Sequence, residues 1–303
     1  WRHHDCDYDR HACAGRYWID GKPVFGGQWG CHGNQEDQHE LDYFWNGPNL
    51  MTGVSFMALM ITAGVTPNAD AVTFNGSNQN LTRTPGAAGN QQIAAISVWV
   101  KRAVTGTAQT IFAWGGGGTN ISQTELQFNS SNKIVVQFGS TAFLVSTPTY
   151  TSTSQWYHIV MHADPNNATA SLRCSVWVAG TEIATWDTDN RSSIVTGTDY
   201  AFNSAVAHYV GRAGDSATRF FNGSMSLCYV FDGVTLSGLL PSAFASAGTA
   251  IQYSGSYGTQ GSFLSWANSA SLGTDSSGNG NTWTLTNITS GNFVSGGGPP
   301  KNY

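Results

Sequence analysis

Short apolar runs, many of them alternating with polar residues, recur along most of the chain and predict β-strands. In the run 171–178, Leu172, Cys174 and Val176 fall on one side of an extended strand, and Trp177 falls on the other. Because the side of Trp177 also carries polar residues, we expect this ring to be exposed. The predicted strands span residues 71–74, 93–101, 110–114, 125–128, 133–138, 142–145, 156–163, 171–178, 181–185, 208–211, 223–231, 263–266 and 282–285.

These strands predict an all-β fold, a two-sheet antiparallel jelly-roll sandwich, because many short strands separated by polar turns are typical of that architecture. Helix signals are confined to 239–245, where Pro241 suits the start of a single turn. Trp99 and Trp156 lie in two of the strands and are large enough to fill the space between the sheets, so we expect both to be buried. Gly223 follows a strand residue and is predicted to adopt a positive φ.

The composition changes near residue 50. The first 50 residues carry twelve of the 31 charged side chains and three of the five cysteines. This change predicts a separate N-terminal segment, and the expected division is an attachment or linker segment (1–70), a jelly-roll domain (71–295) and a C-terminal tail (296–303). The histidines and cysteines of the first part lack the paired spacing of a zinc site, which favours packing and surface roles and leaves a metal site as the alternative. They are His3, His4, Cys6, His11, Cys13, Cys31 and His32.

Charge and hydropathy argue against two classes of partner. The formal net charge is −5, so the surface has no evident electrostatic affinity for nucleic acid or anionic lipid. The longest uncharged apolar run, 54–65, is shorter than the roughly 20 residues that a membrane-spanning helix needs, so we expect no membrane insertion.

Cys174 and Cys228 lie in apolar strand-like runs, where a free cysteine usually behaves as a small buried hydrophobe. We therefore expect both thiols to be free and buried.

Several segments resemble those of laminin-G-like, concanavalin A-like jelly rolls. The opening FNGSNQNLTRTP is followed by ISVWVKR and WYHIV, and later by FNGSMS, VFDG and DSSGNGN. The order of these segments, with LTRTP and SVWVKR first and the DSSGNGN turn last, is most similar to a subgroup found in the virion proteins of tailed phages. The segments occupy residues 74–85, 96–102, 156–160, 221–226, 230–233 and 275–281.

Glucanases share this scaffold and carry an E-x-D-x-x-E strand, whose alternation places the nucleophile and the acid on one face. The nearest string in this chain is ELDYFW at 40–45, where Trp45 stands in place of the second glutamate. Without that acid, a retaining mechanism has no proton donor. We therefore expect no catalytic residues and no enzymatic activity.

The sequence suits a binding role better. Sugar recognition needs aromatic rings and neutral hydrogen-bonding groups, and the chain is rich in both. The resemblance to lectin-type jelly rolls further implies a calcium ion near a rim, for which the DSSGNGN turn is the candidate, with a plain hydrogen-bonded turn as the alternative. The carbohydrate-binding candidates are Trp114, Trp177, Trp186 and Tyr200, and the metal candidates are Asp275, Asn279 and Asn281.

The resemblance implies a non-enzymatic surface protein of a tailed-phage virion, outside the cell, in the form of a fibre, spike or decoration subunit. We expect the jelly roll to attach to a host-surface glycan or to decorate the capsid or tail, and the segment 1–70 to bind other virion proteins. A homo-oligomer, a trimer by analogy with fibres, is also expected. The alternatives are a secreted calcium-dependent lectin or adhesin, and a polysaccharide hydrolase.

Overall fold

The computed structural model describes residues 12–13, 17–19, 22–24, 28–32, 42–46, 68–116, 122–139 and 141–302. The chain forms two units, residues 1–65 and 66–303. In the first unit, one antiparallel sheet has the order β1 (Ala12–Cys13), β4 (Gln28–His32), β5 (Asp42–Asn46), and β2 (Tyr17–Ile19) pairs with β3 (Lys22–Val24). The candidate metal ligands His3, His4, Cys6 and His11 lie outside the described residues, as do the side chains of Cys13, Cys31 and His32.

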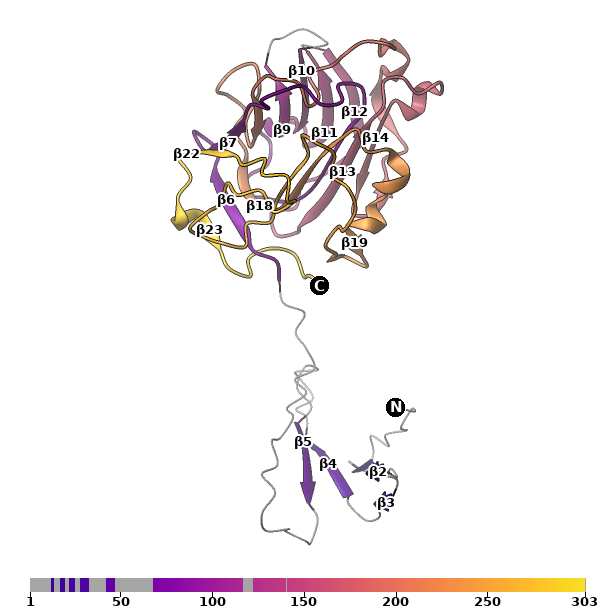
Figure 1. Ribbon diagram of the computed structural model, residues 1–303, viewed down its shortest axis with the longest axis vertical. Helices are drawn as coiled ribbons and strands as arrows, with labels where there is room; N and C mark the ends of the chain where they lie inside the picture. The colour runs from indigo at the N-terminus through magenta and orange to yellow at the C-terminus, as the bar shows by residue number, and fades with distance from the viewer. Residues whose placement is uncertain are drawn as a thin grey trace. The chain divides into compact units, whose positions relative to one another are not determined.

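The second unit is a sandwich of two antiparallel sheets (Figure 1), which confirms the predicted all-β fold. The first sheet has the spatial order β16 (Trp186–Asp189), β12 (Thr141–Thr149), β11 (Lys133–Phe138), β10 (Gln123–Phe128), β9 (Gln109–Gly115), β17 (His208–Val210), β7 (Asn80–Arg83), β22 (Thr284–Thr286). The second has the order β15 (Thr181–Glu182), β14 (Cys174–Val178), β13 (Tyr157–Ala163), β8 (Ala94–Arg102), β18 (Asn222–Asp232), β6 (Ala71–Asn75), β23 (Phe293–Val294), with β21 (Ser262–Leu264) paired to β18.

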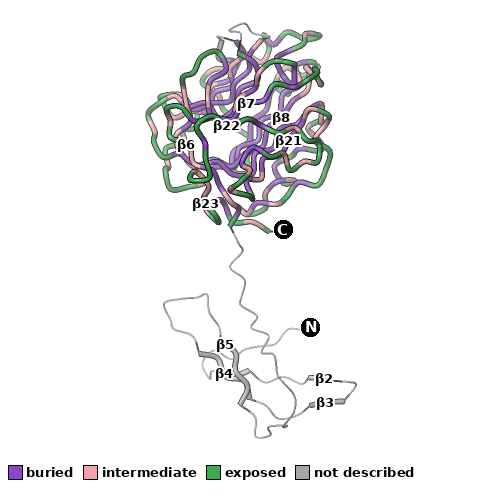
Figure 2. Tube along the Cα trace, turned by 60° about the vertical axis from the view of Figure 1, so that its left-hand side comes forward, coloured by how far each residue is buried: buried purple, intermediate pink, exposed green. Residues whose placement is uncertain are grey.

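Side chains of one parity from both sheets fill the space between them. Ile96, Val98 and Val100 of β8 and Phe112 and Trp114 of β9 belong to this core, and all five are fully buried. The strands of the sandwich are accordingly buried along most of their length (Figure 2). Fully burying one such side chain contributes about 1.5–3 kcal/mol to the free energy of unfolding.

A third layer covers the outer face of the second sheet. Between β18 and β21 the chain forms two single 3₁₀ turns, η3 (Leu236–Gly238) and η4 (Pro241–Ala243), followed by the paired β19 (Ala245–Ser246) and β20 (Thr249–Ala250). The other helical segments in the described residues of this unit are the 3₁₀ turns η1 (Ala170–Leu172), η2 (Arg191–Ser193) and η5 (Ser290–Asn292). Among the residues that the structure describes, no helix has the length and apolar character needed to cross a bilayer.

Trp99 is buried as predicted, but it does not lie between the sheets. It alternates with Val98 and Val100, which point into the core, so its ring faces the third layer and is 4% exposed. There it joins a second apolar cluster that includes Phe244 of the third layer. Trp156, also predicted to fill the core, is half-buried beside this second cluster.

Backbone hydrogen bonds join the two ends of the second unit. The N–H of Ala69 donates to Pro299 O (2.8 Å), and the N–H of Gly298 donates to Ala69 O (2.7 Å). The next residue of the C-terminal segment is bonded as well, since the N–H of Ala250 donates to Pro300 O (2.7 Å). Most of the residues predicted as a separate tail therefore pack onto the body of the unit.

Candidate functional site

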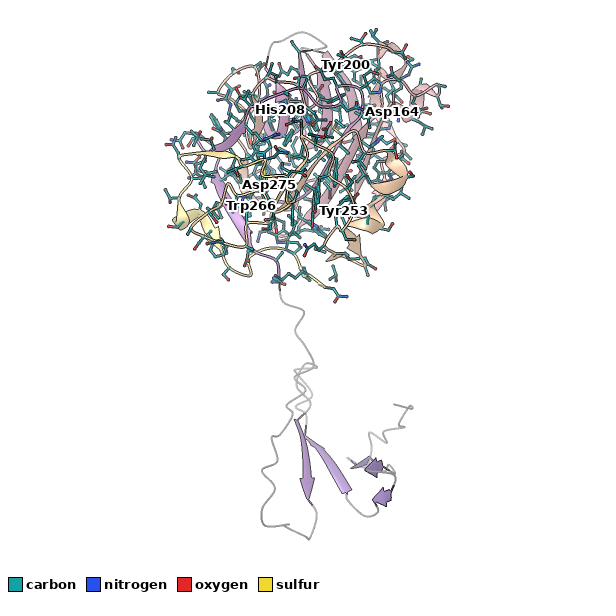
Figure 3. All side chains as sticks on the ribbon, viewed as in Figure 1. Asp164, Tyr200, His208, Tyr253, Trp266 and Asp275 are labelled. Carbon is teal, nitrogen blue, oxygen red and sulfur yellow. The ribbon has the colours of Figure 1, made fainter. Side chains whose placement is uncertain are left out.

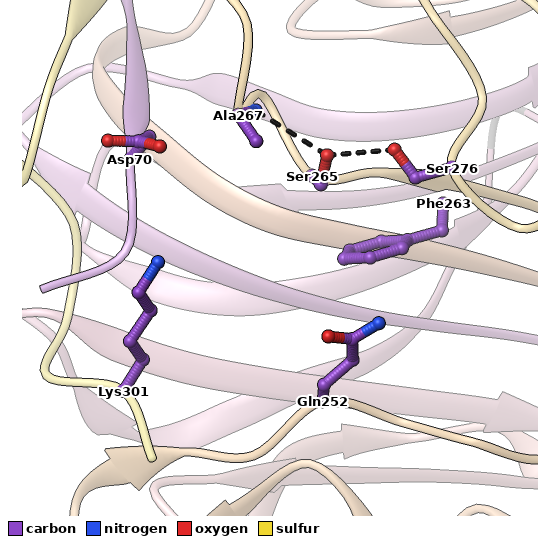
Figure 4. A pocket seen from close by; sticks show the side chains of 7 residues that line it. All are labelled: Asp70, Gln252, Phe263, Ser265, Ala267, Ser276 and Lys301. Carbon is purple, nitrogen blue, oxygen red and sulfur yellow. Dashed lines mark hydrogen bonds between the residues drawn. The ribbon is translucent and has the colours of Figure 1, made fainter. Parts of the chain in front are cut away.

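A pocket of about 200 Å³ opens beside β21 (Figure 4). Its walls come from segments that are far apart in the sequence: the residue before β6, the segment after β20, β21 with the chain that follows it, and the C-terminal segment. The lining residues are Asp70, Gln252, Phe263, Ser265, Ala267, Ser276 and Lys301.

Phe263 forms an apolar wall of the pocket. In the pairing of β21 with β18 it lies opposite Tyr229, and the two rings stack with their centroids 4.1 Å apart and their planes 3° apart. The Phe263 side chain is only 3% exposed. Because the ring is packed on Tyr229 in the second apolar cluster, we expect this wall to keep its shape when a ligand binds.

Asp70 supplies a carboxylate immediately before β6. Its main-chain oxygen accepts a hydrogen bond from the Ser226 hydroxyl (2.6 Å), and its Oδ1 accepts one from the Gly296 N–H (2.9 Å). These two bonds fix the backbone and orient the carboxylate at the edge of the pocket (Figure 4).

Lys301 and Gln252 come from two segments that run side by side. Lys301 forms a parallel bridge with Ala250, and the N–H of Asn302 donates to Ala250 O (2.9 Å). This pairing brings an ammonium group, which donates hydrogen bonds, and an amide group, which both donates and accepts, to the same side of the pocket (Figure 4).

Ser265 and Ser276 line the part of the pocket that faces Gln252 and Lys301 (Figure 4). Their hydroxyl oxygens are hydrogen bonded at 2.8 Å, and the Ser276 N–H donates to Phe263 O (2.7 Å). The pocket thus surrounds an apolar ring with a carboxylate, an ammonium, an amide and two hydroxyls. This combination of donors and acceptors can bind a ligand that carries several hydroxyl groups.

The turn that carries the calcium candidates adjoins the pocket through Ser276, but the oxygens of its carboxylate are already engaged. Asp275 Oδ1 accepts hydrogen bonds from the N–H groups of Phe263 (2.8 Å) and Ser277 (2.9 Å). Asp275 Oδ2 accepts from the Ser277 hydroxyl (2.8 Å) and from the Asn281 N–H (2.8 Å). Four donors therefore surround the one carboxylate of the turn.

The two asparagines of this turn are engaged as well. The amides of Asn279 and Asn281 both donate to Gly261 O, and Asn281 Oδ1 accepts from Arg83 Nη2 (2.5 Å). Calcium needs six to eight oxygen ligands, whereas Asp275 faces N–H and O–H donors, so these residues do not fit a calcium ion. Over the described part of the chain, no three His, Cys, Asp or Glu side chains are grouped to hold a metal.

The four aromatic candidates do not form a platform for a sugar. Trp114 is fully buried between the sheets, and Tyr200 is 3% exposed, in a different part of the unit from Asp275 (Figure 3). Trp177 was predicted to be exposed, but it is only 7% exposed, because its ring belongs to the second apolar cluster on the outer face of the second sheet. Trp186, on β16, is half-buried with a guanidinium 5.7 Å from its ring centroid. None of the four lines the pocket beside β21, and Trp114, Trp177 and Tyr200 are buried in apolar clusters, so this placement does not support these three as binding residues.

No sequence motif identifies the pocket as a whole. Ser276 lies in the DSSGNGN turn and Phe263 in a predicted strand, but neither was a candidate for binding. Asp70, Gln252 and Lys301 lie in separate segments without any pattern that relates them. Only the pairing of these segments in the fold brings their polar groups together.

Glu125 of β10 is a buried carboxylate, but its position does not suit acid–base chemistry. It is fully buried, Oε1 accepts from the Gly214 N–H (2.7 Å), and Oε2 pairs with Arg219 Nη2 (2.8 Å). The same Nη2 lies 3.1 Å from Asp215 Oδ1. The guanidinium therefore bridges the two carboxylates, and Glu125 has no open side from which to reach a sugar.

Part of the chain matches a family of known proteins. Residues 74–238 match the family described as the concanavalin A-like lectin/glucanases superfamily, and no lining residue of the pocket falls in that range. No curated protein matches the sequence.

Three solved structures match parts of the chain at low sequence identity. A candidate carbohydrate binding protein from Bacteroides ovatus matches with a TM-score of 0.53 and 15% identity over 86% of this chain, which covers 64% of that protein. The native heptameric SAP-like pentraxin from Limulus polyphemus matches with a TM-score of 0.42 and 15% identity, over 58% of this chain and 82% of its own. The CBM40 of the Ruminococcus gnavus IT-sialidase, bound to α2,3-sialyllactose, matches with a TM-score of 0.38 and 17% identity, over 57% of this chain and 96% of its own.

Proposed function

Because the chain belongs to the concanavalin A-like lectin/glucanases superfamily, we propose that it binds carbohydrate and that the pocket beside β21 is the binding site. A fold alone does not assign a function. The observation that carries the proposal is the lining of the pocket, which gathers five side chains that donate or accept hydrogen bonds: Asp70, Gln252, Ser265, Ser276 and Lys301. A sugar offers matching groups, since its hydroxyls both donate and accept hydrogen bonds.

Gln252 allows a test that leaves the core intact, because its side chain is exposed. The purified chain is applied to an array of neutral and acidic glycans, and the affinity for the strongest binder is then measured by calorimetry. We predict that Gln252→Ala weakens this affinity about 2- to 12-fold, since one neutral hydrogen bond contributes about 0.5–1.5 kcal/mol. The temperature of unfolding should not change.

Gln155→Ala is the matched control, because Gln155 is also exposed but lies between β12 and β13 and does not line the pocket. This variant should bind as the wild type does. Equal weakening in the two variants would contradict the assigned site, and an array without any bound glycan would contradict the carbohydrate role.

We further propose that the protein is a non-enzymatic fibre, spike or decoration subunit on the outside of a phage particle. The support is the sequence resemblance, in particular the order of the LTRTP, SVWVKR and DSSGNGN segments. In this proposal the first unit binds other virion proteins, and the chain assembles as a homo-oligomer, a trimer by analogy with fibres.

Localisation on purified particles tests the virion role. Peptide mapping and immunogold labelling should find the intact chain on the particle surface. Its recovery from particle-free culture fluid would favour a secreted lectin or adhesin. Release of reducing sugar from polysaccharides by the purified chain would favour a hydrolase.

A further inference from the structure

We propose that the pocket beside β21 selects the terminal residue of an uncharged glycan, an inference that rests on the proposed carbohydrate role. Its size and its balance of charge carry this inference. Both arise from segments outside residues 74–238, so they are features of this chain beyond the segment that matches the family.

The size of the pocket suits one sugar ring. Its volume of about 200 Å³ is below the roughly 300–1,000 Å³ of pockets that hold drug-sized ligands. The wall at Asp70 is tied to the C-terminal segment by the bonds that Ala69 makes with Gly298 and Pro299, and the wall at Lys301 is tied to Ala250. A cavity of this volume admits about one residue of a glycan. The end residue of a chain has a single link to the rest of the glycan, whereas an internal residue has to bring a neighbour on each side, so we expect the end residue to enter.

The charge of the pocket is balanced. Asp70 and Lys301 are the two charged residues among those that line it, and their formal charges cancel. The carboxylate of Asp275, next to Ser276, is already surrounded by four hydrogen-bond donors. The pocket therefore offers no surplus of positive charge to a ligand.

A neutral sugar preserves this balance, because its hydroxyls can donate to the Asp70 carboxylate and accept from the Lys301 ammonium. A sialic or uronic acid adds a second negative charge close to Asp70. Removing that charge from water without a second cation to pair with it is unfavourable. The pocket should therefore discriminate against acidic ends, and Asp70 is the residue that sets this preference.

The test compares matched oligosaccharides in three forms: with a free neutral end, with the same end capped by a sialic or uronic acid, and with the same end blocked by extension of the chain. We expect the wild type to bind the free neutral end at least about tenfold more tightly than either other form. The free monosaccharide of that end should compete.

Charge variants test the role of Asp70 and Lys301. Asp70→Asn gives the pocket a net positive charge, so it should weaken binding of the neutral end about tenfold and reduce the discrimination against the acidic form. Lys301→Met should weaken neutral binding and increase that discrimination. Asp199→Asn, at an exposed carboxylate that does not line the pocket, should change neither value. The temperature of unfolding of each variant shows whether it is folded.

The outcomes separate the two proposals. If no glycan of any form binds, the carbohydrate role itself fails. If glycans bind but the acidic or extended form binds as well as the free neutral end, only the present inference is overturned. A folded Asp70→Asn variant that keeps both affinity and discrimination also overturns it.

Discussion

At the scale of single residues, burial determines the chemistry of the two cysteines in the second unit. Cys174 and Cys228 are both free and buried, as predicted. Burial raises the pKa of the Cys174 thiol to about 12, and it raises the pKa of Cys228 as well. Because the thiolate is the reactive form, we predict that iodoacetamide at pH 8 alkylates neither cysteine in the folded protein.

Peptide mapping by mass spectrometry measures this directly. The same sample unfolded in guanidinium chloride is the control, and there both peptides should be fully alkylated. Rapid labelling of either peptide without denaturant would show that the strands around it open far more often than their packing suggests.

At the scale of elements, β18 and β8 approach each other too closely at Gly223 to admit a side chain. The φ of Gly223 is +149°, positive as predicted, and a Cβ there would lie 2.2 Å from Lys101 O and 2.9 Å from Ala103 N. Since both are backbone atoms, the added methyl group has to push the chains apart. We predict that Gly223→Ala lowers the free energy of unfolding by about 1–3 kcal/mol, measured by urea unfolding.

Gly86→Ala serves as the control for this change. A Cβ at Gly86 would meet no atom within 4 Å, so its effect should stay within about 0.5 kcal/mol. Equal losses in the two variants would mean that the close approach at Gly223 is not the cause.

The strand faces show what alternation in the sequence reveals and what it does not. Cys174 and Val176 lie in the core between the sheets, and Trp177 lies on the opposite face, as the alternation predicts. The expectation that Trp177 is exposed failed because the sequence does not indicate that a third layer covers that face. Leu172 is 43% exposed because η1 precedes β14, so the strand is shorter than predicted.

At the scale of the whole second unit, the candidate site depends on contacts between its two ends. The sandwich could be predicted because each strand carries its own alternating pattern. The pocket could not, since Asp70 and Lys301 meet only after β23 and the C-terminal segment have paired with the start of the unit. Such long-range pairing leaves no periodic signal in the sequence.

Three buried histidines make the stability of this unit depend on pH. Burial lowers the pKa of His158 to about 3 and that of His162 to below its usual value. Burial, with a contribution from Arg83, also lowers the pKa of His208 to about 3. In the unfolded chain each histidine takes up a proton near pH 6.5. Between these values the unfolded state binds more protons, so the stabilisation is complete above about pH 6.5 and is lost as the pH falls toward 3.

We therefore predict that the free energy of unfolding falls by roughly 2 kcal/mol per fully buried histidine between pH 7 and pH 5, measured by urea unfolding. His208→Asn isolates one share, because the N–H of Gly115 donates to His208 Nδ1 (3.2 Å) and an asparagine oxygen can accept the same bond without titrating. The dependence on pH should be weaker in this variant by about one histidine's contribution. If the variant and the wild type lose stability equally between these pH values, groups other than His208 cause the acid sensitivity, and its burial is less complete in solution than the packing of β17 against β9 implies.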